Sequence, residues 1–434
     1  MLNIHCYHFR CYLPWTILFR AFFMIIRNSY LTDYAQHNKE RTDHMNDFDY
    51  MKLALQLAVK GCGYVSPNPM VGAVIVKDGR IIGSGYHERY GSYHAERNAL
   101  ASCTESPKGA TMYVTLEPCC HHGKQPPCVD AILEAGISRV VVACGDPNPL
   151  VAGKGINILR KNGILVTEHV LEEECRRLNE VFFHFIQTKR PYVVMKYAMT
   201  LDGKIATYTG ASKWITSETA RTHVQTQRHR YSAIMVGVGT VLADNPLLTC
   251  RMEGGRNPIR IVCDTRLRTP LDSQIVQTAR EVPTILATCC EEKEKHLPFE
   301  KAGCQILVVP QENGHINLSV LMQLLGEQGI DSILLEGGAT LNWSALQSGI
   351  VQKVQAYIAP KLFGGEHAKS PIGGLGFPTP AAGVVLKNVT VQPLKASKND
   401  VSVTFSNSAQ ITETDLLTDF FIEGEVDNHV HRNH

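Results

Sequence analysis

The sequence predicts two α/β domains that meet near residue 190, each built as helices on both faces of a sheet. Two observations predict this class. From Met45 onward, short β-rich runs alternate with amphipathic runs of helical period. The 434 residues also exceed one ordinary domain, and Pro191 opens new strand material after a long helical run. We find no repeat between the halves, so the domains are expected to differ in content.

The first domain is expected over residues 45–189. Gly61 ends its first helix, and the dipeptide Asp78-Gly79 predicts the turn of a hairpin. The predicted helices are 48–61, 94–103, 128–136 and 171–190, with a hairpin within 70–88 and strands at 110–118 and 139–147.

The second domain is expected over residues 190–407 and is richer in strands. The predicted strands are 192–203, 233–244, 258–265, 284–290, 305–310, 331–338, 353–360 and 401–406, and the helices are 217–233, 318–329 and 341–349.

Both ends of the chain are expected to lie outside the domains. Residues 1–44 contain an apolar run, 11–26, that Pro14 and Arg20 interrupt and that is shorter than the roughly 20 residues of a spanning helix. We expect an N-terminal extension, either disordered or a mis-assigned start upstream of Met45. The tail 408–434 is acidic and then His-rich, and is expected to be unpacked.

The composition excludes several classes of protein. With 44% hydrophobic and 19% charged residues, the chain is typical of a folded protein rather than a disordered one. The net charge of +2 gives no sign of a nucleic-acid or membrane partner. Fourteen cysteines over so long a chain do not suggest a disulfide framework, which favours the cytoplasm.

A zinc site is predicted from His94 and Glu96 together with Pro118-Cys119 and Cys128. One imidazole and two thiolates hold a tetrahedral zinc and leave its fourth position for a water of lowered pKa. A carboxylate that is not a ligand then relays the proton to a leaving amine, which is the role predicted for Glu96. We expect both cysteines at the starts of helical segments, where the thiolate is favoured.

The stretch 119–128 offers more candidate ligands than one site needs. Cys119 and Cys120 are adjacent and cannot easily share one ion, so His94, Cys119 and Cys128 are the predicted set. Packing or solvent exposure is favoured for Cys120 and His122. His121 stays open between substrate contact and loop packing.

A resemblance adds to these patterns. The His-Ala-Glu motif, the long gap in "EPCCHHGKQPPC", and the segments 66–83 and 146–164 resemble the bifunctional riboflavin-biosynthesis deaminase/reductase family. It implies a cytidine-deaminase-like three-layer domain followed by a dihydrofolate-reductase-like domain. It also implies zinc-dependent removal of the 2-amino group of 2,5-diamino-6-(5-phosphoribosylamino)pyrimidin-4-one. Asn68 would contact this substrate, with plain turn chemistry as the alternative.

Nucleotide-binding features of the second half are weaker. "VGVGT" (236–240) begins a dinucleotide fingerprint but lacks the third glycine. Gly337-Gly338 ends a strand and leads into a helix, which suits a phosphate or, alternatively, a simple tight turn. Arg228 and Arg251 are candidates for a mononucleotide phosphate.

The resemblance assigns further residues in this half. It implies NADPH-dependent reduction of the ribosyl side chain to ribityl, with Glu336 and Lys196 as candidate general acids, in a dimer or tetramer. The NADPH contacts it carries over are Ala198, Trp214, Thr240, Asp244, Thr265, Gly338, Ala339, Thr340, Leu341, Asn342, Trp343 and Ser344. The substrate contacts are Lys196, Ser212, Arg228, Leu248, Arg251 and Glu336.

Two other functions are weighed against this one. A nucleic-acid-editing deaminase would carry a basic groove and a two-residue gap between its cysteines, and the sequence predicts neither. A zinc-stabilised binding module without activity would need Glu96 to be dispensable, yet a carboxylate beside a three-ligand zinc site argues for catalysis.

Overall fold

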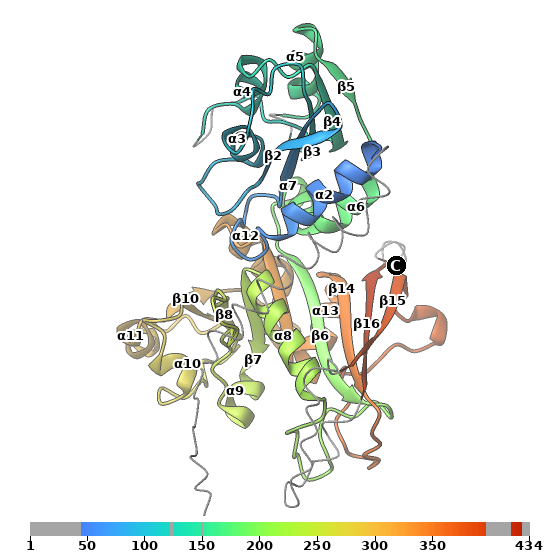
Figure 1. The fold of residues 1–434 in the computed structure, drawn as a ribbon. Coiled ribbons are helices and arrows are strands. Elements are labelled where there is room, and N and C mark those ends of the chain that lie inside the picture. Colours follow the sequence, from blue (N-terminus) through green and yellow to red (C-terminus); the bar gives the residue numbers. More distant parts are fainter. Residues whose placement is uncertain (1–44, 122–124, 149–150, 396–417, 428–434) are drawn as a thin grey trace, which may run out of the picture.

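The computed structural model describes residues 45–121, 125–148, 151–395 and 418–427, which form the two lobes of Figure 1. The apolar run 11–26, His122 and the predicted strand 401–406 lie outside the described residues. Within the described residues, none of the helices is long and apolar enough to cross a bilayer.

The first lobe is a five-stranded sheet of order β2-β1-β3-β4-β5 between two layers of helices. Gly72 packs against Ala54 of α2, while Gly85, on the opposite face, packs against Ala99 of α3. This confirms the predicted three layers. Its elements are α2 Asp47–Val59, β1 Gly72–Lys77, β2 Arg80–Tyr86, α3 Ala95–Ala101, β3 Thr111–Leu116, α4 Cys128–Glu134, β4 Arg139–Cys144, α5 Lys154–Lys161, β5 Leu165–Thr167, α6 Glu172–Leu178 and α7 Glu180–Thr188.

The predicted helix 171–190 is wrong in one respect, because the structure divides it at Asn179 into α6 and α7. The Asn179 side chain accepts a hydrogen bond from the Met70 amide (2.8 Å) and donates one to the Met70 carbonyl (3.0 Å). The break between the two helices is therefore anchored to the loop that contains Met70.

The second lobe is a nine-stranded sheet of order β10-β9-β8-β7-β13-β6-β14-β16-β15. Helices α12 and α13 cover one face, and α8 to α11 lie on the other. Its strands are β6 Tyr192–Thr200, β7 Ala233–Gly237, β8 Ile259–Cys263, β9 Thr284–Thr288, β10 Gln305–Val308, β13 Ser332–Gly337, β14 Val351–Ala359, β15 Leu386–Leu394 and β16 Asp419–Val426. The small hairpin β11 Gln311–Glu312 and β12 His315–Ile316 is separate. Its helices are α8 Glu218–Arg230, α9 Val238–Asp244, α10 Gln274–Gln277, α11 Lys293–Ala302, α12 Leu318–Glu327, α13 Ala339–Gln347 and the 3₁₀ turn η1 Pro380–Ala382.

Two expectations for this lobe are corrected. The predicted strand 233–244 ends at Gly237, and α9 follows it. The tail after 408 is not wholly unpacked, because β16 lies between β14 and β15 in the sheet. Asp419 of β16 also accepts hydrogen bonds from the Ser217 amide (2.7 Å) and hydroxyl (2.5 Å), at the start of α8. The tail is therefore anchored by backbone pairing and by a helix cap.

Candidate active sites

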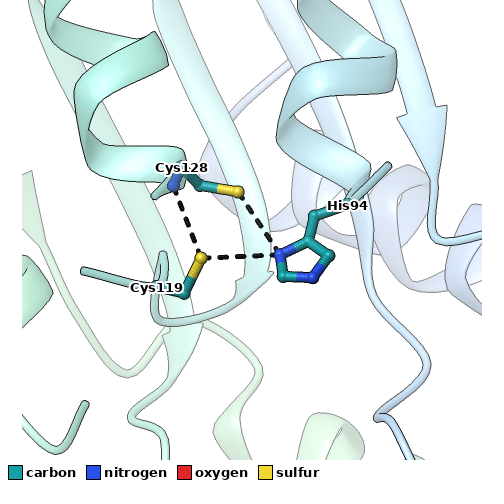
Figure 2. A group of neighbouring side chains, drawn as sticks. All are labelled: His94, Cys119 and Cys128. Carbon is teal, nitrogen blue, oxygen red and sulfur yellow. Dashed lines mark hydrogen bonds between the residues drawn. The ribbon is translucent and has the colours of Figure 1, made fainter. Parts of the chain in front are cut away.

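Three side chains that are distant in sequence meet in the first lobe (Figure 2). His94 Nδ1 lies 3.5 Å from Cys119 Sγ and 3.4 Å from Cys128 Sγ. Among the described residues, these three form the one group of at least three potential metal ligands whose atoms lie within 4.8 Å of one another. A tetrahedral zinc with standard bond lengths would separate nitrogen and sulfur ligands by about 3.5 Å. The cluster therefore fits zinc without rearrangement.

Local structure explains how the three side chains meet. His94 is the N-cap of α3, Cys119 follows β3, and Cys128 is the first residue of α4. Arg97 of α3 donates a hydrogen bond to the Pro127 carbonyl at 2.9 Å, which ties the two helix starts together. The expectation that Cys119 also begins a helix is wrong, since it lies in a loop. Its sulfur instead accepts the Cys128 amide at 3.4 Å, at the N-terminus of α4.

The electrostatics of the cluster favour a thiolate. A hydrogen bond from Cys128 lowers the pKa of the Cys119 thiol to about 4, against the opposing effect of burial and with the help of His94. The same hydrogen bond raises the pKa of Cys128, because one proton is shared between the two sulfurs. A bound cation would remove this competition, since both sulfurs could then be thiolates.

Glu96 lies beside the cluster but is not one of its ligands. It occupies the first turn of α3 and is only 3% exposed. Burial, together with the neighbouring Cys119 charge, raises its pKa to about 7. A carboxyl group with such a pKa can both take up and release a proton near neutral pH.

A cavity of about 330 Å³ opens onto this cluster. The predicted residues that line it are Asn68, His94, Glu96, Cys119 and His121. Within the described part of the chain, the buried Nδ1 of His121 has no hydrogen-bond partner. The position of His121 in the lining puts its side chain within reach of a molecule bound in the cavity. Cys120, by contrast, packs against the hydrophobic core, in agreement with the packing role expected for it.

Sequence patterns missed several polar residues of this cavity, among them His87 and Asp146. His87 places Nε2 3.2 Å from the Asn68 amide nitrogen, and its ring packs edge-on against His94. Asp146 follows β4, and burial raises its pKa to about 6. No motif marked His87, whereas Asp146 follows a strand end, a position that could have been searched.

A larger cavity, of about 720 Å³, lies at the carboxyl ends of strands in the second lobe. Strands β7 and β13 are parallel neighbours, and each leads directly into a helix, α9 and α13 respectively. Two helix N-termini therefore lie side by side at the cavity, as a pyrophosphate would require. The predicted residues that line the cavity are Ser212, Thr240, Asp244, Thr265, Gly338, Ala339, Thr340, Leu341 and Ser344.

The other predicted cofactor residues lie outside this lining. Asn342 and Trp343 point to the far side of α13, because helical periodicity puts residues 340, 341 and 344 on the cavity face. Asn342 donates to the Pro371 carbonyl at 2.8 Å, and Trp343 packs on Phe377. Both hold the loop that carries Lys369 to the cavity. Ala198 packs near the Tyr357 cluster, while Trp214 is 59% exposed and stacks on Arg221.

Three of the predicted substrate residues form a buried ion cluster, and two others lie apart from it. Arg228 makes a bidentate pair with Glu336, at 2.7 and 2.9 Å, and Lys196 Nζ lies 3.6 Å from the same carboxylate. Leu248 is instead part of a hydrophobic core, and Arg251 is exposed. None of these five residues lines the larger cavity.

Glu336 remains a carboxylate in this ion triad. Burial alone would raise its pKa, but the charges of Arg228 and Lys196 outweigh burial and lower the pKa to about 2. Burial lowers the pKa of Lys196, with Glu336 opposing the effect. Lys196 is thus the member of the triad whose pKa is shifted toward neutral pH.

Three basic or titratable side chains of the larger cavity were also missed: Arg268, His315 and Lys369. Arg268 follows the carboxyl end of β8, and Thr265 lies between them. The strand-end rule that identified the other residues could have found Arg268. His315 begins the short strand β12 and Lys369 lies in a loop, and no local pattern connects either residue to the site.

Comparisons with known proteins match both halves of the chain. Residues 45–144 match the family model of the cytidine and deoxycytidylate deaminase zinc-binding region, and residues 191–403 match that of the RibD C-terminal domain. The riboflavin biosynthesis protein RibD of Actinobacillus pleuropneumoniae is 59% identical over 332 residues, covering 76% of this chain and 88% of that protein. RibD of Escherichia coli is 44% identical over 335 residues, covering 74% and 90%.

Solved structures agree with these matches. A diaminohydroxyphosphoribosylaminopyrimidine deaminase/5-amino-6-(5-phosphoribosylamino)uracil reductase from Thermotoga maritima is 37% identical, covers 88% of this chain and 99% of its own, and has a TM-score of 0.71. RibD of Acinetobacter baumannii is 34% identical with the same coverage and a TM-score of 0.73.

Proposed function

This chain belongs to the RibD family of riboflavin-biosynthesis enzymes, and on that premise we propose roles for the residues of its two cavities. The chain combines a zinc-dependent deaminase with an NADPH-dependent reductase. In the proposed sequence, 2,5-diamino-6-(5-phosphoribosylamino)pyrimidin-4-one first loses its 2-amino group as ammonia. The ribosyl side chain of the product is then reduced to ribityl, giving 5-amino-6-(5-phosphoribitylamino)uracil.

For deamination, His94, Cys119 and Cys128 would hold the zinc ion. When bound, zinc supplies an activated water as nucleophile. Glu96 would accept the proton of this water and deliver it to the leaving amino group, for which its pKa of about 7 is suited. The single observation that carries this proposal is the position of Glu96, buried beside a three-ligand cluster and facing the same cavity.

Substrate recognition would fall to the polar rim of the 330 Å³ cavity. His121 lines this cavity, so it would contact the pyrimidine. Asn68 is oriented by His87 and would also bond the ring. A near-neutral chain with a small cavity supports a free nucleotide rather than a nucleic acid as substrate.

For reduction, the order of the strands supports one orientation of NADPH. Strands β8, β7, β13 and β6 are consecutive in the sheet. Thr265 and Arg268 at the β8 end would hold the adenosine 2′-phosphate, and the N-termini of α9 and α13 would hold the pyrophosphate. NADPH supplies the hydride that C1′ of the opened ribosylamine receives. The nicotinamide end would then face β6, the strand of Lys196.

Lys196 is the proposed general acid of the reductase, rather than Glu336. A carboxyl group with a pKa of about 2 has no proton to give at neutral pH. Glu336 would instead orient Lys196 and keep it near the substrate. Arg228 already donates to Glu336 and to the Thr249 carbonyl (3.0 Å), so its proposed role is to position the carboxylate.

The decisive test compares Glu96→Gln with the wild type in two separate assays. We expect the variant to retain zinc and to oxidise NADPH normally on the deaminated intermediate. Ammonia release should fall by a factor of about 10²–10⁴, the usual contribution of a general acid–base group. Full deamination by the variant would contradict the role given to Glu96.

A further inference from the structure

Helix α7 forms one wall of the deaminase cavity and also the border with the reductase lobe. Phe182, Phe185 and Ile186 of α7 line the cavity. Their spacing puts them on one helical face. The loop that contains Asn68 also lines the cavity. The shape of the cavity therefore depends on where α7 sits relative to this loop.

The first residue of α7, Glu180, is held by three side chains of the reductase lobe. Lys353 Nζ of β14 lies 2.6 Å from its carboxylate, the hydroxyl of Tyr192 of β6 donates at 3.1 Å, and Arg230 Nη2 of α8 lies 3.4 Å away. The side chains of Glu180 and Lys353 are 13% and 10% exposed, so water screens their pairing little. The reductase sheet thus fixes the start of α7.

The neighbouring residue joins the start of α7 to the loop that contains Asn68. Asn179 bonds both backbone groups of Met70, two residues after Asn68. A small cavity of about 40 Å³ lies behind the wall, lined by Asn68 and Phe182 of the deaminase lobe and by Arg230 and Asp331 of the reductase lobe. Reductase side chains therefore lie directly behind two residues of the deaminase cavity.

We propose that Glu180 is a positioning residue of the deaminase, through which the reductase lobe fixes the wall of the deaminase cavity. The inference rests on the proposed deaminase function. Glu180 belongs neither to the metal cluster nor to the cavity lining. Its loss should therefore weaken substrate capture and leave the chemical step in place.

The test uses the full-length zinc-loaded enzyme with Glu180→Gln and, separately, Lys353→Gln. Both should raise KM for deamination about tenfold, within the hundredfold that an ångström of misplacement can cost, with kcat little changed. Lys353→Gln is the sharper variant, because it alters the reductase lobe and yet should act on deamination. KM for NADPH should stay at the wild-type value in both. The double variant should cost less than the sum of the two single variants, since both substitutions break the contact between Glu180 and Lys353.

Glu172→Gln is the matched control. Glu172 pairs with Arg176 at 2.8 Å on α6, close to Glu180 in sequence, and this pair is on the surface. Its substitution should leave both activities unchanged. An active wild type whose deamination KM is unaltered in Glu180→Gln and Lys353→Gln would overturn the inference, as would a lower melting temperature with an unchanged KM. A wild type that releases no ammonia would instead contradict the proposed function itself.

Discussion

Replacing Cys128 with serine should remove zinc, whereas replacing Cys120 should not. The two residues are matched in chemistry, and both lie in the stretch that carries the ligands. Cys128 Sγ lies 3.4 Å from His94 Nδ1, while Cys120 packs against the core. Cys128→Ser leaves two of three protein ligands, and a hydroxyl is a poor substitute for a thiolate.

The size of the effect follows from the geometry. The nitrogen and sulfur atoms already lie at the separation that a tetrahedral zinc requires. Zinc binding therefore needs little rearrangement, and removing one ligand removes most of that ligand's contribution to affinity. Changes in residues that merely orient ligands cost roughly 10–100-fold in metal affinity. Loss of a ligand itself should therefore cost more than about a hundredfold.

Zinc content after dialysis against a competing chelator provides the assay. Wild type and Cys120→Ser should retain one equivalent of zinc per site, and Cys128→Ser should retain almost none. Circular dichroism checks that each variant is folded. If Cys120→Ser lost zinc while Cys128→Ser retained it, the ligand set would be wrong, and so would the argument from distances.

Three further outcomes are expected in the reductase lobe. Arg268→Gln should raise KM for NADPH about 10- to 100-fold and leave KM for NADH unchanged, because a charge-assisted bond to a phosphate contributes roughly 1.5–3 kcal/mol; an equal rise for both cofactors would contradict the placement of the 2′-phosphate. The pKa of Glu336 is about 2 when folded and near 4.5 when unfolded, so its carboxylate adds about 3 kcal/mol of stability above pH 4.5 that is lost as the pH falls toward 2. Urea unfolding at a series of pH values should show this acid loss in the wild type and not in Glu336→Gln, and parallel curves would refute it. Gly338 has a φ of +93°, so Gly338→Ala should lower the free energy of unfolding by about 1–2 kcal/mol, whereas Gly239→Ala, a control with open space around its Cα, should cost less.

Much of this arrangement could be predicted from the sequence, because local patterns carried it. The hairpin at Asp78-Gly79 and the helix that His94 begins follow from residues next to one another. The three candidate ligands could be grouped because metal chemistry restricts which residue types come together. The end of β7 at Gly237 was missed, because an apolar run does not distinguish a strand from the short helix that follows.

What could not be predicted depends on distant partners. The helix is divided at Asn179, although no glycine or proline lies there. The Asn179 side chain is instead hydrogen-bonded to the backbone of Met70, 109 positions away. Asn342 and Trp343 were carried over as cofactor contacts, but the helix turns them toward the loop after Pro371. Lys353 and Glu180 are 173 positions apart, and no local pattern joins them.

The place of β16 bears on the order in which the reductase sheet can form. β15 precedes β16 in the chain, but it pairs with β16 and has no direct pairing with β14. During synthesis, β15 thus emerges from the ribosome before the strand that joins it to the sheet. Residues 386–394 must wait as an unpaired segment until residues 419–426 have been made. A fragment that stops at 407 would lack β16, so β15 and the edge of β14 would stay unpaired. It would also leave Ser217 without the Asp419 carboxylate. Any separate reductase should therefore extend through Val426.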